Sequence, residues 1–119
     1  MEPDLIGLTL FDNADLHLTL PVLDTTEAAV DMTDWPFKLQ LKFDEFDAAV
    51  ALDVAVSVQA EGELLLEASK ANIAAIWPAG STKKRFSLVG DLLTKPYNGA
   101  YVACIGVVKA LAKKGTSTL

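Results

Sequence analysis

The chain has few of the residues from which catalytic and metal centres are most often built. Its 119 residues include one cysteine, Cys104, and one histidine, His17. A lone cysteine excludes a disulfide within the chain, and His17 alone would have to serve every zinc site or Ser-His-Asp arrangement. We therefore expect a non-enzyme with no catalytic residue, no cofactor-binding residue and no metal ligand.

Other scarcities narrow the class of protein further. Seven glycines and five prolines are too few for a collagen-like or disordered chain. Lysine and arginine total 10 against 16 acidic residues, a net charge of -6, which disfavours binding to a nucleic-acid backbone. The basic groups 83–85 and 113–114 are interpreted as solvated strand and tail positions. No apolar run approaches a membrane span, and the acidic N-terminal residues differ from a signal peptide, so we expect no membrane partner.

What the chain does have is alternation of apolar and polar residues with a period of two. From Phe37 to Phe43 the apolar side chains fall on one side and Lys38, Gln40 and Lys42 fall on the other. A strand with one wet face has this pattern, because successive side chains point to opposite faces of the sheet. The segments 16–20 and 52–58 alternate in the same way. The sequence therefore predicts an all-β domain.

The pattern and its turn signals predict about seven strands in one domain, residues 1–119. The expected strands cover residues 5–11, 14–23, 37–43, 51–60, 64–67, 83–92 and 100–111. One short helical turn is expected near 69–76, with Ser69 as its N-cap, and residues 112–119 are expected to fray. Short strands separated by turns every eight to twelve residues favour an immunoglobulin-like antiparallel β-sandwich. A closed barrel is the alternative.

The alternation also predicts which side chains meet in the interior. They are Phe37, Leu39, Leu41, Val54, Val56, Val58, Phe86, Leu88, Tyr101 and Ile105. Asn98-Gly99 is the strongest short hairpin signal in the chain, because both residues tolerate the positive φ of a type I′ turn. We expect this turn to connect the last two strands.

Acidic and aromatic residues outside the strands leave two interpretations open. Acidic residues gather at Asp31 and Asp34 and again over 44–47, but without the glycine-containing turn of a calcium loop, so solvated loops are the preferred interpretation. Trp35 and Trp77 each precede a proline at the boundary of an element. They either form a platform for stacking a sugar or, as we prefer, are buried side chains that close an end of the sandwich.

Several segments of the chain resemble a known protein family. Residues 29–42 (AVDMTDWPFKLQLK) resemble a "V-D-L-T-G/D-W-x-F-x-x-Q-I-R" stretch of small phage and prophage structural proteins. Residues 64–69 and 76–80 (LLLEAS and IWPAG) resemble an "L-x-L-S … W-P-A-G" segment. Residues 85–91 occupy the position of a "Y-x-x-D-L" strand in these proteins, and residues 98–108 resemble their closing "D-G … G-x-V-x-V" hairpin. The family resembled is the immunoglobulin-like N-terminal module of upper baseplate, or receptor-binding apparatus, proteins of tailed phages.

The resemblance implies a virion structural protein of the tail, baseplate or fibre attachment that acts by protein–protein assembly. It implies other virion proteins and further copies of the chain as partners, and a location in the virion after assembly in the host bacterial cytoplasm. The residues expected at the interaction surface are Asp31, Asp34, Trp35, Trp77, Tyr97 and Asn98. The alternative is a carbohydrate-binding or adhesion module that uses Trp35, Trp77, Tyr97 and Tyr101, with calcium at the acidic loop near Asp44.

Overall fold

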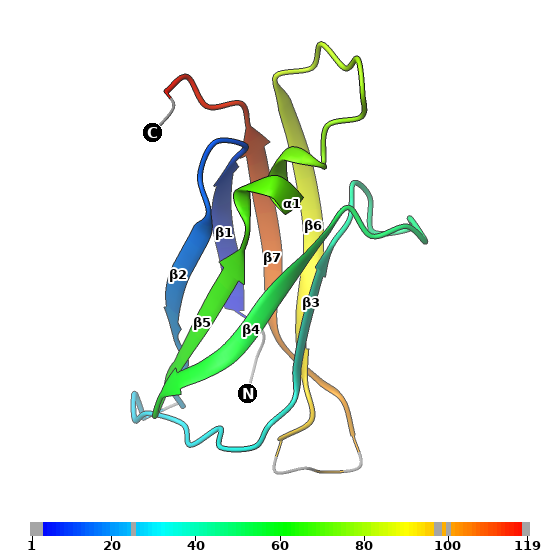
Figure 1. Ribbon diagram of the computed structural model, residues 1–119. Helices are drawn as coiled ribbons and strands as arrows, with labels where there is room; N and C mark the ends of the chain where they lie inside the picture. Colours follow the sequence, from blue (N-terminus) through cyan, green and yellow to red (C-terminus); the bar gives the residue numbers. More distant parts are fainter. Residues whose placement is uncertain (1–3, 25, 97–98, 100, 118–119) are drawn as a thin grey trace.

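A computed structural model describes residues 4–24, 26–96, 99 and 101–117 (Figure 1). Within these residues the chain forms seven strands and one short helix, so the predicted all-β fold is confirmed. The elements are β1 (Asp4–Phe11), β2 (Leu16–Pro21), β3 (Phe37–Leu41), β4 (Leu52–Ala60), β5 (Glu63–Ala68), α1 (Lys70–Ala74), β6 (Arg85–Thr94) and β7 (Ala103–Lys113).

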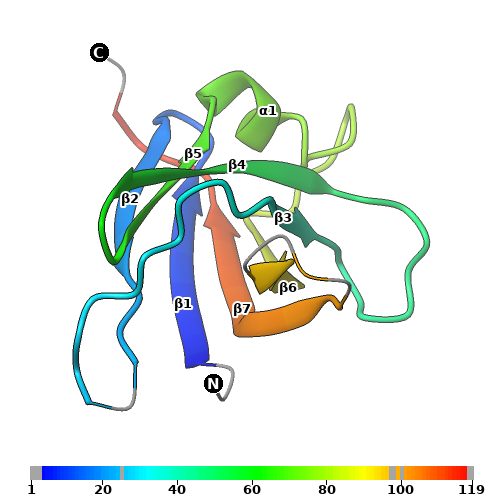
Figure 2. The same cartoon turned by 90° about the horizontal axis from the view of Figure 1, so that it is seen from below.

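The strands form one continuous hydrogen-bonded sheet that folds over on itself. Its order is β1-β7-β6-β3-β4-β5-β2. Strand β4 belongs to both halves, because its first residues pair with β3 and its remainder, from Ala55, pairs with β5 (Figure 2). One half therefore contains β1, β7, β6, β3 and the start of β4, and the other contains the end of β4, β5 and β2. This is the strand pairing of an immunoglobulin-like sandwich.

The first and last strands pair in parallel, which the sequence did not indicate. Asp4 lies opposite Gly106, and the register continues to Phe11 opposite Lys113. The other strand pairs are antiparallel, as expected. Alternation in β1 places Ile6, Leu8 and Leu10 toward the interior whichever way the strand runs, so the pattern carries no information on direction.

Leucine side chains dominate the interior between the two halves. The side chains of Leu39, Leu41, Leu66, Leu88 and Leu92 are at most 1% exposed. Of the side chains predicted to lie in the core, Leu39, Leu41, Val54, Leu88 and Ile105 are buried, and Phe37, Val56 and Phe86 are partly buried against them. The prediction of one core is therefore correct for these residues.

Two predicted core residues are exposed instead. Val58 is 39% exposed although its partner on β5, Leu64, is buried, because β3 pairs with β4 only as far as Val54 and leaves that side of β4 uncovered at Val58. Tyr101 is 61% exposed, because β7 begins only at Ala103. At its other end β7 continues to Lys113, so Ala112 is fully buried in a strand rather than part of a frayed tail.

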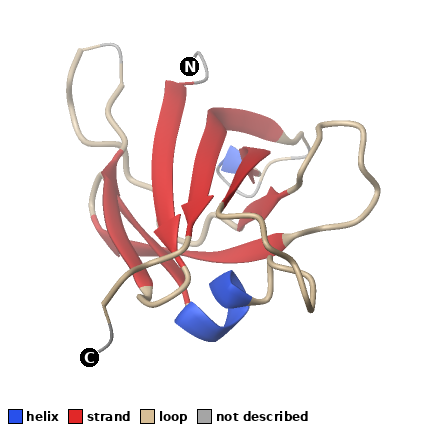
Figure 3. Ribbon diagram, turned by 90° about the horizontal axis from the view of Figure 1, so that it is seen from above, coloured by secondary structure: helices blue, strands red, loops and turns tan. Residues whose placement is uncertain are grey.

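The two ends of the sandwich are closed in different ways. The helix end carries α1, the turn 12–15 and the start of β6, and the loop end carries residues 22–36, the β4–β5 turn and the start of β7 (Figures 1 and 3). The helix begins as predicted: the Ser69 hydroxyl accepts a hydrogen bond from the Asn72 backbone N–H at 3.2 Å. Ile73 and Ile76 bury their side chains and close the helix end.

Strands β3 and β6 approach each other closely at Gly90. A Cβ atom at this position would lie 2.4 Å from the carbonyl oxygen of Gln40. Just beyond it, Lys42 and Val89 exchange two backbone hydrogen bonds of 2.8 Å. A residue without a side chain is therefore required for β3 to pair with β6 along this stretch.

Candidate functional site

The predicted interaction residues divide between the two ends of the sandwich. Asp31, Asp34 and Trp35 lie at the loop end, in the segment that leads into β3, whereas Trp77 follows α1 at the helix end. Tyr97 and Asn98, and with them the predicted Asn98-Gly99 turn, lie outside the described residues. Trp35 and Trp77 therefore cannot belong to one shared platform.

Trp35 closes the interior at the loop end. Its side chain is 7% exposed, and its backbone N–H donates to the carbonyl of Met32 at 3.0 Å. Met32 itself is fully buried. This burial supports the interpretation of Trp35 as a side chain that seals the sandwich.

Trp77 belongs to an aromatic cluster at the helix end. Its indole N–H donates to the Lys83 carbonyl at 2.9 Å, and its ring meets Phe86 nearly edge-on at 5.5 Å. Phe43 also packs against Phe86, with 5.3 Å between the ring centroids, and the Lys83 ammonium lies 5.0 Å from the centroid of the Phe86 ring. These contacts hold Trp77 against the body, in a geometry typical of a structural aromatic cluster.

The acidic residues of the loop end organise their own loops. Asp31 Oδ1 accepts from the Thr33 hydroxyl at 2.6 Å and from the Thr33 backbone at 3.1 Å. Asp24 Oδ1 accepts likewise from Thr26 and also from the Ala28 backbone. The threonine hydroxyls are the main reason that the pKa values of both carboxyls lie below their usual range. Both side chains are exposed to solvent.

We predict that Asp24 contributes to the loss of stability in acid. Its pKa is lower in the folded state, so its stabilising effect is present above the unfolded pKa and is lost as the pH falls through the folded pKa. An Asp24→Asn variant should therefore lose stability less steeply than the wild type below about pH 4. Thermal unfolding at pH values from about 2 to 6 measures this. An equal dependence of melting temperature on pH in the two proteins would contradict the prediction. Asp47→Asn is the matched control and should behave like the wild type.

A wide groove opens at the loop end between the first and second strands. Its volume is about 760 Å³, and its floor contains the buried side chains of Ile6, Val22 and Trp35. Its other lining residues include Tyr101, Leu23, Asp4, Asp24, Pro96 and Cys104. Leu23 is 49% exposed and Tyr101 61% exposed, so this groove offers apolar surface bordered by two carboxylates. No motif in the sequence marks it, because its residues come from separate strand ends.

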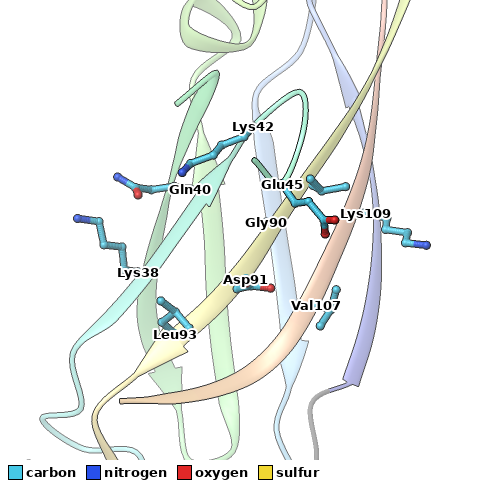
Figure 4. Close-up of a pocket in the computed structure, with 10 residues that line it drawn as sticks. Lys38, Gln40, Lys42, Glu45, Gly90, Asp91, Leu93, Val107 and Lys109 are labelled. Atoms are coloured by element: carbon cyan, nitrogen blue, oxygen red, sulfur yellow. The ribbon is translucent and has the colours of Figure 1, made fainter. Parts of the chain in front are cut away.

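A smaller groove of about 290 Å³ lies on the outer face of β3, β6 and β7 (Figure 4). Lys38, Lys42 and Lys109 surround it, while Asp91 and Glu45 lie nearer its centre. Alternation in the three strands brings these outward side chains together. The groove combines apolar side chains, among them Leu93 and Val107, with charges of both signs, so it favours no single class of ligand.

The residues with nucleophilic or basic chemistry are far from one another in the sheet. His17 lies opposite Glu67 on the β2–β5 pair, with 3.6 Å between its Nδ1 and the carboxylate. Cys104 lies on β7, and its half-buried thiol contacts the Gly106 carbonyl at 3.3 Å. The arrangement does not place an imidazole beside the thiol.

Over 4–24, 26–96, 99 and 101–117, no group of three histidine, cysteine or acidic side chains is placed to hold a metal ion. The part of the chain that the structure describes contains no helix with the length and hydrophobicity to cross a membrane.

No family model and no curated protein matches the chain.

Proposed function

We propose that this protein is a non-catalytic structural component of a phage or prophage particle, in the tail, baseplate or fibre attachment. It acts by protein–protein assembly, both with neighbouring virion proteins and with copies of itself, and it resides in the virion. The sequence resemblance is one basis of the proposal. The structural observation that supports it most is the unprotected edge formed by β1.

Strand β1 is an edge strand without the features that prevent pairing with another chain. Among the described residues it pairs with β7 on one side and with no strand on the other. After Asp4 it has no charged residue and no proline as far as Phe11, and Leu5 is 71% exposed. Soluble monomers usually protect such edges with lysine, proline or bulges, because free N–H and C=O groups invite another strand. The edge of β2 ends instead at Pro21.

We predict that lysine substitutions at outward-facing positions of β1 weaken assembly without unfolding the protein. The variant is Leu5→Lys with Thr9→Lys, two exposed positions on the edge strand. A charge there must be desolvated when a second strand pairs, so concentration-dependent association should weaken by at least about tenfold. Light scattering over a concentration series measures this.

The matched control makes the same change in net charge on inner strands. Val107→Lys with Glu67→Gln changes two exposed positions, on β7 and β5, each of which has a paired strand on both sides. This control should assemble like the wild type, with an unchanged melting temperature in both variants. Equal association of both variants would count against the edge as the contact.

The location in a virion requires a separate test. Particles purified after prophage induction in the organism that encodes the chain should contain the protein in stoichiometric amounts by quantitative mass spectrometry. A protein that is absent from every particle fraction, and monomeric at all concentrations, would refute the proposal.

Carbohydrate binding is a second candidate, which one observation favours. Tyr101, mostly exposed, lies on the groove of the loop end together with Asp4 and Asp24. An aromatic face beside carboxylate acceptors suits the apolar face and hydroxyl groups of a sugar. Glycan arrays with and without calcium separate the candidates: specific retention that Tyr101→Ala removes would favour carbohydrate binding.

A further inference from the structure

The fold gathers positive charge at the helix end of a protein that is acidic overall. Two groups of basic residues that are far apart in the sequence become one patch there. Arg85 lies opposite Lys113 on neighbouring strands, and the Lys114 backbone N–H donates to the Lys84 carbonyl at 3.2 Å. The basic end consists of Lys70, Lys83, Lys84, Arg85, Lys113 and Lys114.

Four carboxylates lie within or beside this basic end, those of Asp12, Asp15, Glu67 and Asp44. Asp12 accepts a hydrogen bond of 2.7 Å from the Gly115 backbone N–H. Asp15 accepts another of 2.7 Å from the Lys70 backbone N–H. Among the described residues, none of the six basic side chains forms an ion pair with these four carboxylates, so their excess positive charge is open to a partner.

The loop end carries the opposite charge. Its separate segments are held together by backbone contacts: Val22 and Gly62 are hydrogen-bonded at 2.8 Å, and Pro21 pairs with Glu63. The acidic end consists of Asp4, Asp24, Glu27, Asp31, Asp34, Glu61 and Glu63, with Lys95 as a basic residue among them.

The distance between the two ends makes them independent charged surfaces. The molecule is 46 Å long, and the strands run between the ends (Figure 1). The screening length at physiological salt is about 8 Å, so the charges of one end do not neutralise those of the other within one molecule. Each end is free to attract the opposite end of another copy.

Apolar surface accompanies the charge at both ends. At the acidic end, Leu23 and Tyr101 stand exposed on the groove between β1 and β2. At the basic end, Phe11 is 42% exposed and lies opposite Lys113 on the neighbouring strand. Stable protein interfaces combine an apolar centre with a polar rim, and each end supplies both.

We infer that the basic end of one copy docks onto the acidic end of the next. The contact is heterologous, because two different surfaces meet, so it builds rings or filaments rather than closed twofold dimers. This inference rests on the proposed structural function and specifies one contact of that assembly, distinct from the β1 edge.

The test blocks one end at a time by reversing charges at exposed residues. The basic-end variant is Lys84→Glu with Lys114→Glu, and the acidic-end variant is Glu27→Lys with Glu61→Lys, which leaves β1 unchanged. Sedimentation velocity at about 50 mM NaCl should show a series of oligomers for the wild type that dissociates by about 500 mM. Each variant alone should associate at least about tenfold more weakly.

Mixing the two variants provides the decisive measurement. Each retains one unaltered end, so an equimolar mixture can form the wild-type contact once and should stop at a one-to-one complex. Asp53→Lys with Asp91→Lys is the control: it makes the same change in charge as the acidic-end variant, at exposed positions within β4 and β6 away from both ends, and should associate like the wild type.

Three results would overturn the inference: a wild type that stays monomeric at low salt, a variant that associates like the wild type, or a mixture that remains monomeric. If the protein is nevertheless a constituent of phage particles, the proposed function stands and this contact alone is wrong. Absence from particles together with intact head-to-tail association would refute the virion role and leave the contact valid.

Discussion

Replacing Leu39 with alanine is expected to lower the free energy of unfolding by about 2 to 5 kcal/mol. Leu39 lies on β3 at the centre of the folded sheet, paired with Val54 on one side and Leu92 on the other, and is 1% exposed. Its truncation removes apolar contacts with both neighbours and leaves a cavity that the surrounding strands cannot close. Urea denaturation of the two proteins measures the difference.

Val58→Ala is the matched control for this substitution. Val58 lies on β4 and was predicted to share the core, but its side chain is 39% exposed. The expected loss is below about 0.5 kcal/mol, as for most surface substitutions. A large loss at Val58 together with a small loss at Leu39 would show that the faces of these strands are assigned wrongly.

The second large effect is expected at Gly90. A methyl group there would contact the Gln40 carbonyl oxygen and the Leu41 side chain at distances shorter than real contacts allow. The backbone of β3 must move away to relieve this, so Gly90→Ala should cost about 2 kcal/mol or more.

Gly7→Ala is the corresponding control, because a Cβ atom at Gly7 meets no atom within 4 Å. It should be neutral or stabilise the protein by up to about 1 kcal/mol, since alanine restricts the unfolded chain more than glycine does. Calorimetry measures the change in melting temperature. A decrease for Gly90→Ala together with no change or an increase for Gly7→Ala would confirm the close approach of β3 and β6. Similar effects at both would argue against it.

The local features of this fold were accessible from the sequence because local rules determine them. Alternation from Phe37 to Leu41 located β3 and its buried face, and the side-chain oxygen of Ser69 located the helix start. The exposure of the Val58 and Tyr101 side chains could not be predicted from the sequence. It depends on how far each strand extends past its neighbours, which is a property of the assembled sheet.

The candidate surfaces were harder to predict than the fold. The sequence places 83–85 and 113–114 almost thirty residues apart, and only the pairing of β6 with β7 unites them. Likewise, the groove at the loop end forms only because β1 and the end of β2 lie beside each other in the fold. No pattern in the sequence predicts this proximity. The residues that sequence patterns singled out, Trp35 and Trp77, serve mainly to close the two ends.

The parallel pairing of β1 with β7 also determines how the molecule bears a mechanical load. The described chain enters β1 at the loop end and leaves β7 at the helix end, so a pull on the two termini acts along these neighbouring strands in opposite directions (Figure 1). Such a pull shears the whole ladder from Asp4 to Phe11 at once. Its hydrogen bonds must break together rather than one after another, so the strand pair acts as a clamp under tension.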